Sequence, residues 1–300
     1  MSTTGSPVLV FHRIAELRAW RREQVLQGRT IGFVPTMGAL HEGHLNLVRA
    51  ARSSCDRVVV SIFVNPAQFA PHEDLHAYPR TLDRDVALLT SASAHVVFAP
   101  TVAEMYPSGI TLDVQAQRGT FLEVLGKSHQ MEGDPRPHFF RGVATVVLKL
   151  LNAVQPDRAY FGQKDAQQCV VVKTMVRDLL LPVEIVTVPT TRAANQLALS
   201  SRNKYLSPDQ IPAALTLQRS LAAAQALYEQ QGERNREALL GAAQRVFDDQ
   251  PDAQLEYLSL AHPETLDELE QIGEDGAIIS GAFRVGSARL IDNILLGCTL

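Results

Sequence analysis

The chain has 300 residues, of which 46% are hydrophobic and 20% charged, and its formal net charge is −4. This length suffices for two domains of ordinary size or for one large domain, and the composition is that of an ordinary globular protein. The acidic balance argues against nucleic acid as a partner, because no basic tract is present to neutralise a phosphate backbone. A small anionic ligand in a local positive pocket remains compatible with this charge.

The cysteines and the N-terminus bear on the compartment. Cys55, Cys169 and Cys298 are odd in number, far apart and in no C-x-x-C arrangement, which predicts reduced, structural thiols in a reducing compartment. Residues 1–8 are expected to form a flexible leader. Because no basic segment precedes a long apolar core and no apolar run reaches about 18 residues, we expect no signal peptide and no membrane span. The expected location is therefore cytoplasmic.

Helical and strand patterns alternate along the first 190 residues. The expected strands cover 31–34, 58–64, 96–99, 110–114, 158–162 and 183–188, and the expected helices cover 11–27, a segment ending near 53, 82–91, 142–154 and 166–180. Residues 126–138 are predicted to form a mobile loop. This alternation favours a parallel sheet with crossover helices. We therefore predict a Rossmann-like, doubly wound α/β domain over residues 1–190.

The pattern changes after about residue 190. Alanine-rich helices are expected over 208–227 and 234–247, and strands over 255–260, 276–283 and 288–295, without β-α-β alternation. These elements predict a smaller α+β domain over residues 191–300 that covers the active site.

The loop after the strand at 31–34 carries the strongest chemical pattern, with His41 and His44 three residues apart at the start of a helix. This spacing places both imidazoles on one face, and Gly43 lets a ligand approach the backbone. A helix N-terminus adds unpaired N–H groups and a partial positive charge, so the loop suits a polyphosphate. Metal ligation is the alternative, but it needs a third ligand that this stretch does not clearly supply.

Two further loops follow strands whose carboxyl ends should meet at the same edge of the sheet, where ligands collect. Asn65 and Gln68 are neutral amides, which either hold a hydroxy acid by its hydroxyls and carboxylate or cap a turn. Lys164 can contact phosphate as a point charge, and Asp165 can hold a ribose or cap the next helix. Gln168, three residues further on, should point the same way as Asp165.

A fourth polar segment, Leu199–Arg202, lies just past the change of domain. Two hydroxyls and a guanidinium suit a flap that grips phosphate. Taken alone, the same segment is more simply interpreted as the N-cap of a following helix.

Six segments together resemble the pantoate–β-alanine ligase family. They are V-P-T-M-G-A-L-H-E-G-H, S-I-F-V-N-P-x-Q-F, E-D-L-x-x-Y-P-R-T, R-G-V-A-T-V-V, Q-P-D-R-A-Y-F-G-Q-K-D-x-Q-Q and L-A-L-S-S-R-N. The resemblance covers about residues 31–206 and is far more specific than H-x-G-H alone, which the wider nucleotidylyltransferase superfamily shares. It implies a reaction in two steps. Pantoate attacks the α-phosphate of ATP, with Mg²⁺ on the phosphates, to give pantoyl adenylate and pyrophosphate, and β-alanine then displaces AMP to form pantothenate. It also implies a homodimer.

The resemblance also implies roles for individual residues. His44 would be the general acid at the phosphates, with Asp85 as a Mg²⁺ ligand. The other residues implied in catalysis are His41, Lys164, Ser200, Ser201 and Arg202. ATP would contact Met37, Gly38, Ala39, Leu40, His41, Glu42, Gly43, His44, Gly162, Gln163, Lys164, Asp165, Leu199, Ser200, Ser201, Arg202 and the backbone of Thr191. Pantoate or β-alanine would contact Gln68, Gln168, Asn65 and Arg136.

Three positions depart from the family pattern. Many members have R-P-G-H-F-R-G-V, whereas here Phe139 takes the place of the histidine and His138 that of the preceding glycine. The common D-G before L-A-L-S-S-R-N is Asn195-Gln196, which is expected to stiffen the flap. The common G-E-K-D has Gln163 in place of glutamate, a neutral change.

Two other functions compete with the ligase. One is a nucleotidylyltransferase that keeps AMP or CMP in its product, and the other is a nucleotide-binding protein without catalytic activity. Turnover eliminates the second, and release of AMP that requires both pantoate and β-alanine eliminates the first.

Overall fold

The computed structural model describes residues 8–70, 73 and 75–300, which form two compact units. The first unit takes in the described residues up to Ser128 together with Arg136–Gly162 and Val171–Val188. The second consists of His129–Pro135, Gln163–Val170 and Pro189–Leu300. The sequence predicted a single boundary at residue 190. Two short segments before it, His129–Pro135 and Gln163–Val170, also belong to the second unit.

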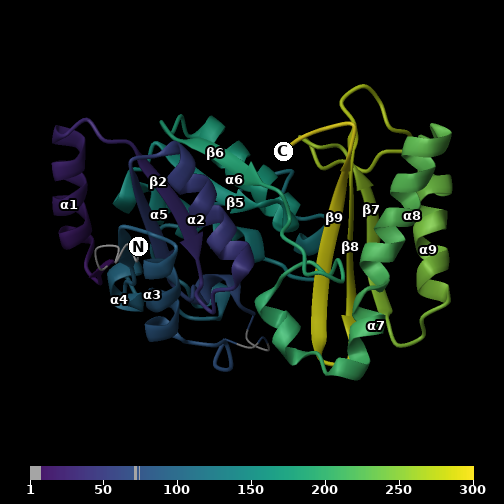
Figure 1. Ribbon diagram of the computed structural model, residues 1–300. Helices are drawn as coiled ribbons and strands as arrows, with labels where there is room; N and C mark the ends of the chain where they lie inside the picture. Colours follow the sequence, from purple (N-terminus) through teal and green to yellow (C-terminus); the bar gives the residue numbers. More distant parts are fainter. Residues whose placement is uncertain (1–7, 71–72, 74) are drawn as a thin grey trace, which may run out of the picture. The chain divides into compact units, whose positions relative to one another are not determined.

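The first unit is built on a six-stranded parallel sheet with the order β1-β4-β3-β2-β5-β6. Three of its strands, β2, β5 and β6, are labelled in Figure 1. The strands are β1 (Leu9–Phe11), β2 (Ile31–Thr36), β3 (Arg57–Ile62), β4 (Val96–Phe98), β5 (Arg158–Gly162) and β6 (Glu184–Val188). From β2 the chain moves outward through β3 and β4, and it then continues on the other side of β2 with β5 and β6. The strand order therefore reverses between β2 and β5, which is where doubly wound sheets bind ligands.

Helices cover this sheet as the alternating pattern predicted. The predicted helices are α1 (Ile14–Leu26), α2 (Glu42–Ser54), α3 (Leu82–Ser91), α5 (Phe139–Val154) and α6 (Ala166–Asp178), whose first five residues belong to the second unit. The short helix α4 (Val102–Met105) was not predicted. Val58 and Val60 of β3 join a buried cluster with Val48 of α2 and Leu89 of α3. Val59, between them, points to the opposite face and is also fully buried. The β-branched run therefore forms a strand that is buried on both faces.

The second unit has an antiparallel sheet of β7 (Gln254–Ala261), β8 (Ala277–Val285) and β9 (Ala288–Leu296), in that order. The short α7 (Ile211–Ala214) precedes α8 (Thr216–Gln231) and α9 (Arg236–Asp248), which pack on each other and on the sheet (Figure 1). Leu217 and Leu221 of α8 and Phe247 of α9 share a buried cluster with Phe283 of β8. The α+β prediction for this region is confirmed.

Some predicted elements were wrong. Residues 110–114 form no strand, because Asp113 accepts a hydrogen bond from the Gln115 N–H and starts a 3₁₀ turn, Val114–Ala116. The helix predicted over 208–227 is broken into a 3₁₀ turn, α7 and α8, with Pro212 in the first turn of α7. The short strand β1 was missed, and residues 1–7 of the predicted leader lie outside the described residues.

Two further observations concern membrane-spanning helices and the cysteines. In the described part of the chain, no helix is both long and apolar enough to cross a membrane. Cys55, Cys169 and Cys298 form no disulfide.

Candidate active site

The loop after β2 turns sharply before α2 begins. Gly38 and Ala39 both have left-handed backbones, with φ of 86° and 51°. A Cβ atom at Gly38 would lie 3.1 Å from the Ile62 side chain and 3.2 Å from the Asp85 carboxylate. Glycine is therefore required at position 38 both for its conformation and for the close approach of Asp85.

Asp85 of α3 holds this loop. Its fully buried carboxylate accepts hydrogen bonds at 2.9 Å from the N–H groups of both Ala39 and Leu40, and at 3.1 Å from the Thr81 hydroxyl. Such charge-assisted bonds offset the cost of burying a charge. Because both carboxylate oxygens are used, the geometry favours a positioning role for Asp85 over the metal-ligand role predicted from the sequence. Across residues 8–70, 73 and 75–300, no group of three or more His, Cys, Asp and Glu side chains forms a metal-binding cluster.

His41 and His44 lie together at the start of α2, as predicted. Nδ1 of His41, the N-cap residue, accepts a hydrogen bond from the Gly43 N–H at 3.2 Å, and the His41 N–H donates to Nδ1 of His44 at 3.3 Å. The ring centroids are 4.1 Å apart. Since each Nδ1 acts as an acceptor, the hydrogen of a neutral ring is on Nε2. The first turn of α2 thus combines two imidazole donors with the partial positive charge of a helix N-terminus.

Asn65 follows β3 and is almost fully buried. Its Nδ2 donates to the Gln68 side-chain oxygen at 3.0 Å and to the Gly142 carbonyl at 3.1 Å. Its Oδ1 accepts from the Tyr106 hydroxyl at 2.6 Å and from the Ala67 N–H at 3.3 Å. These are the four hydrogen bonds that an amide can make. The geometry therefore favours the capping alternative for Asn65, with its side chain fixing Gln68.

Gln68 lies where the loops after β2 and β3 meet. Its side-chain nitrogen is 3.2 Å from the Met37 sulfur. Arg136 binds Glu73 through two nitrogens, at 2.8 and 3.0 Å, and its guanidinium also lies 3.4 Å from the Gln68 carbonyl oxygen. Arg136 thus stabilises the turn that contains Gln68. Because its guanidinium is paired with Glu73, we expect Arg136 to contribute less to binding a substrate carboxylate than the sequence predicts.

The start of α5 packs closely against the Gln68 turn. A Cβ atom at Gly142 would lie 2.2 Å from the Ala67 carbonyl oxygen, so only glycine permits this approach. Phe139, at the usual histidine position, packs under the Arg136 guanidinium with 3.8 Å to the ring centroid. His138, at the usual glycine position, is exposed and has a left-handed backbone with φ of 69°.

The turn Gln163–Asp165, which follows β5 along the chain, belongs to the second unit. Asn293 of β9, which is 2% exposed, donates to the carbonyl oxygens of Gln163 and Lys164, both at 2.9 Å. The Lys164 ammonium lies 3.5 Å from the Asp165 carboxylate. Gln168 is half-buried in the first turn of α6.

Ser200 begins a short 3₁₀ helix, Ser201–Tyr205, and its hydroxyl accepts from the Arg202 N–H at 3.2 Å. The N-cap interpretation of Ser200 is therefore confirmed. The Thr191 carbonyl accepts from the Leu199 N–H at 2.9 Å, which closes the hairpin before the flap. At the base of that hairpin Arg192 forms two hydrogen bonds with the buried Asp292 carboxylate, at 2.6 and 3.0 Å.

Sequence reasoning missed Asn293 and Asp292, which hold the two loops of the second unit from β9. The sequence did contain an indication of their role. These two polar residues interrupt the apolar run of 290–295, and buried polar side chains need hydrogen-bond partners. Tyr106, whose hydroxyl binds Asn65, had no such signal. Burial raises the pKa of Tyr106 well above its usual range, so the hydroxyl stays a hydrogen-bond donor.

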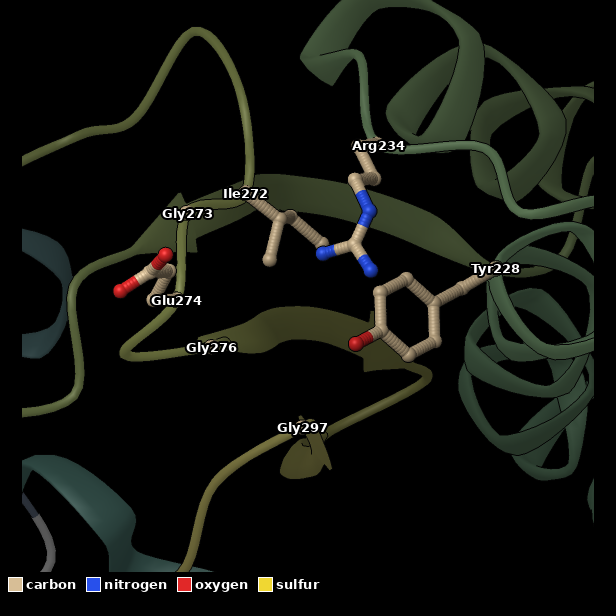
Figure 2. Close-up of a pocket in the computed structure, with 7 residues that line it drawn as sticks. All are labelled: Tyr228, Arg234, Ile272, Gly273, Glu274, Gly276 and Gly297. Atoms are coloured by element: carbon tan, nitrogen blue, oxygen red, sulfur yellow. The ribbon is translucent and has the colours of Figure 1, made fainter.

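The second unit also has a pocket of about 460 Å³ that contains none of the predicted residues. In Figure 2 the Arg234 guanidinium and the Tyr228 hydroxyl point into it, whereas the Glu274 carboxylate points away. The pocket is lined by Tyr228, Arg234, Ile272, Gly273, Glu274, Gly276 and Gly297.

The first unit has the features of an α/β nucleotide-binding enzyme. A histidine-capped helix N-terminus lies at the switch point of a doubly wound sheet, and Met37 of the same loop touches a neutral amide from the neighbouring loop. The site is therefore suited to an anionic nucleotide and a second, polar substrate.

The chain belongs to the pantoate–β-alanine ligase family, whose model matches residues 9–295. It is 54% identical to the pantothenate synthetase of Chloroflexus aggregans, over 96% of this chain and 99% of that protein. A pantothenate synthetase structure from Thermus thermophilus has a TM-score of 0.87 at 46% identity, covering 96% of this chain and 99% of that one. A Francisella tularensis structure, described as complexed with β-γ ATP and β-alanine, has a TM-score of 0.76 at 35% identity, covering 96% and 97%. The chain is thus a ligase of pantothenate biosynthesis, which condenses pantoate with β-alanine in an ATP-dependent reaction.

Proposed function

We propose that this ligase works through a pantoyl adenylate. A carboxylate oxygen of pantoate attacks the α-phosphorus of ATP, and the bond to the bridging oxygen of pyrophosphate breaks. The β-alanine amine then attacks the acyl carbon, loses a proton and expels AMP. The observation that carries this proposal is the histidine-capped N-terminus of α2, because its donors suit the charge that develops on phosphoryl oxygens.

The histidines have distinct roles in this scheme. With each Nδ1 accepting a backbone N–H, we assign the Nε2–H groups of His41 and His44 as donors to phosphate oxygens. His44 acts as the general acid at the departing pyrophosphate. Lys164 adds a positive charge at the phosphates, and Gln163 and Asp165 complete that turn's contacts with ATP. Ser200, Ser201 and Arg202 contact ATP from the flap, and the Thr191 backbone contacts its adenine.

Gln68 is proposed to bind pantoate directly, and Gln168 to bind it as a second amide. A neutral amide holds the hydroxyls and carboxylate without the tight ion pair that would make the carboxylate a poorer nucleophile. Asn65 and Arg136 act through Gln68, since the first binds its side chain and the second lies at its carbonyl. The β-γ ATP and β-alanine named for the Francisella protein support sites for both ligands in this family.

Magnesium is proposed to accompany ATP without a dedicated protein cage. The cation commonly keeps several waters and binds substrate phosphates with few protein ligands. Both Asp85 oxygens already accept hydrogen bonds from the loop, so we assign Asp85 to positioning. When bound, Mg²⁺ would neutralise charge on the phosphates.

We further propose a homodimer located in the cytoplasm, as the resemblance implies. Light scattering on the purified chain tests the first point, with a mass of about twice 32.9 kDa as the expected result. Fractionation of cells that express the tagged chain tests the second.

Pyrophosphate exchange tests the mechanism. Labelled pyrophosphate should enter ATP when pantoate is present and β-alanine is absent, and the exchange should saturate with pantoate. Net AMP release should require both substrates. A preparation that forms pantothenate but shows no exchange would contradict the stepwise route. Pyrophosphate exchange that does not depend on pantoate would favour a nucleotidylyltransferase with another acceptor.

A further inference from the structure

A second cluster of donors lies at the amino-terminal edge of the parallel sheet, opposite the edge that carries the histidine loop. Arg29 precedes β2, Arg57 begins β3, His95 directly precedes β4, and Arg52 is in the last turn of α2. Arg52 Nη1 lies 3.3 Å from Nε2 of His95, and Arg57 Nη1 lies 3.5 Å from the same atom. Two guanidinium groups thus lie against one imidazole, and the Arg29 guanidinium shares the Gln24 side-chain oxygen with that of Arg57.

The imidazole of His95 is fixed by the backbone of β3. The Val58 N–H donates to its Nδ1 at 2.9 Å, while the His95 N–H donates to the Val58 carbonyl at 3.0 Å. Because Nδ1 is an acceptor, a neutral ring carries its hydrogen on Nε2. That N–H faces the N–H groups of Arg52 and Arg57, so donors face one another at the centre of the cluster.

In the part of the chain that the structure describes, two oxygen atoms accept hydrogen bonds from these guanidinium groups. The Gln24 side-chain oxygen takes one hydrogen bond from Arg29 and one from Arg57, at 3.0 and 3.1 Å. The Asp56 carbonyl takes one from Arg57 at 2.9 Å and one from Arg52 at 3.4 Å. The Asp56 carboxylate accepts hydrogen bonds from the N–H and hydroxyl of Thr30, at 2.9 and 2.8 Å.

The electrostatics agree with this excess of donors. Burial, together with the charges of Arg52, Arg57 and Arg29, lowers the pKa of His95 from 6.5 to about 4. Burial and the charges of Arg29 and Arg52 likewise lower the pKa of Arg57. The positive charges of the arginines therefore oppose protonation of His95, and a bound anion would relieve that repulsion.

We propose that Arg29, Arg52, Arg57 and the His95 Nε2–H form a binding site for a tetrahedral oxyanion of the phosphate class, separate from the ATP site. Guanidinium groups bind phosphate oxygens through paired N–H donors, and an imidazole N–H supplies one further bond. The carboxyl ends of β2 and β3 lead to the catalytic loops, whereas this cluster is at their other ends. A phosphate bound here therefore needs no contact with His41 or His44.

Histidine NMR tests the proposal on the full-length enzyme. The imidazole resonances are followed while potassium phosphate is added at pH 7, with potassium chloride at equal ionic strength as the control, and His95→Gln assigns the signal. Phosphate should shift the His95 signal saturably and chloride should not. Parallel titrations with pyrophosphate and AMP identify the source. A saturable shift with any of the three supports the site, and no shift with all three overturns it.

Two variants and a control complete the test. Arg52→Gln and Arg57→Gln should each weaken phosphate binding about tenfold, as expected for the loss of one charge-assisted contact. Arg177→Gln, on an exposed part of α6, should leave binding unchanged. If Arg52→Gln and Arg57→Gln bound phosphate as tightly as the Arg177→Gln control, the proposal would be overturned. Bound phosphate should also raise the pKa of His95 above about 4, because an anion favours the protonated ring, and an unchanged pKa at saturation would contradict contact with Nε2.

Discussion

The loops that follow β2 and β5, two neighbouring strands of one sheet, are held in different ways. The loop after β2 is fixed inside the first unit, by the left-handed Gly38 and by the carboxylate of Asp85, 45 and 46 residues along the chain from its partners. The turn after β5 is fixed by Asn293, 129 and 130 residues away on β9. One loop therefore depends on the sheet's own helices, and the other on the C-terminal sheet.

Because the two loops are held by different parts of the chain, we expect them to respond to different substitutions. Changes near Asp85 should affect the histidines and leave Lys164 in place, whereas changes at β9 should affect Lys164 and leave the histidines in place. The substitutions below test that independence, beginning with the largest expected effects.

Removing the donors themselves should have the largest effect. We expect His44→Ala and Lys164→Ala each to reduce turnover by about 10²-fold or more, because each removes a donor to the developing phosphoryl charge. Steady-state measurement of kcat, with His76→Ala and Lys173→Ala as controls, checks this. Near-normal turnover in both variants would contradict the roles assigned to the two loops.

Asp85→Asn should lower kcat at least tenfold and the free energy of unfolding by about 2 kcal/mol, because charge-assisted bonds to two backbone N–H groups are weakened. The magnesium concentration for half-maximal activity should stay unchanged. Asp83→Asn, on the exposed side of the same helix, is the matched control. A large increase in the magnesium requirement with unchanged stability would instead identify Asp85 as a metal ligand.

The sequence predicted the loop after β2 better than the turn after β5, for a physical reason. The β-branched runs, Gly38 and the histidine spacing are local patterns, and local patterns determine strands, turns and helix starts. The link from Asn293 to Lys164 joins distant parts of the chain, and no local period encodes it. The same reason explains why the return of His129–Pro135 to the second unit was not predicted, since that segment is held by the Glu132–Arg289 ion pair, at 2.7 and 2.8 Å.

Asn293→Ala tests the second half of the comparison. It leaves two carbonyl oxygens of the Lys164 turn without their donor, so we expect the KM for ATP to rise about tenfold, a loss of roughly 1.4 kcal/mol. Asn152→Ala, at an exposed amide that bonds within its own helix, is the control. The histidine resonances of His41 and His44 should not move. A change in those resonances as large as the change in KM would mean that the two loops are not independent.

The smallest effects are expected where the chain departs from its family. His138 and Gln196 both replace a glycine of the common pattern, and both have left-handed backbones, with φ of 69° and 73°. His138→Gly and Gln196→Gly should each raise the free energy of unfolding by about 0.5 kcal/mol, because glycine adopts this conformation without a Cβ penalty. Chemical denaturation measures the change. His138→Ala keeps the Cβ atom and should bring no gain.

Activity separates the backbone explanation from a catalytic one at position 138. Phe139 and Arg136 already pack where the usual histidine would be, and the His138 imidazole is exposed. We therefore expect His138→Ala and His138→Gly to keep turnover within about twofold, well below the 10²-fold loss expected for His44→Ala. A loss in both variants equal to that of His44→Ala would mean that the imidazole of His138 has taken over the function of the missing histidine.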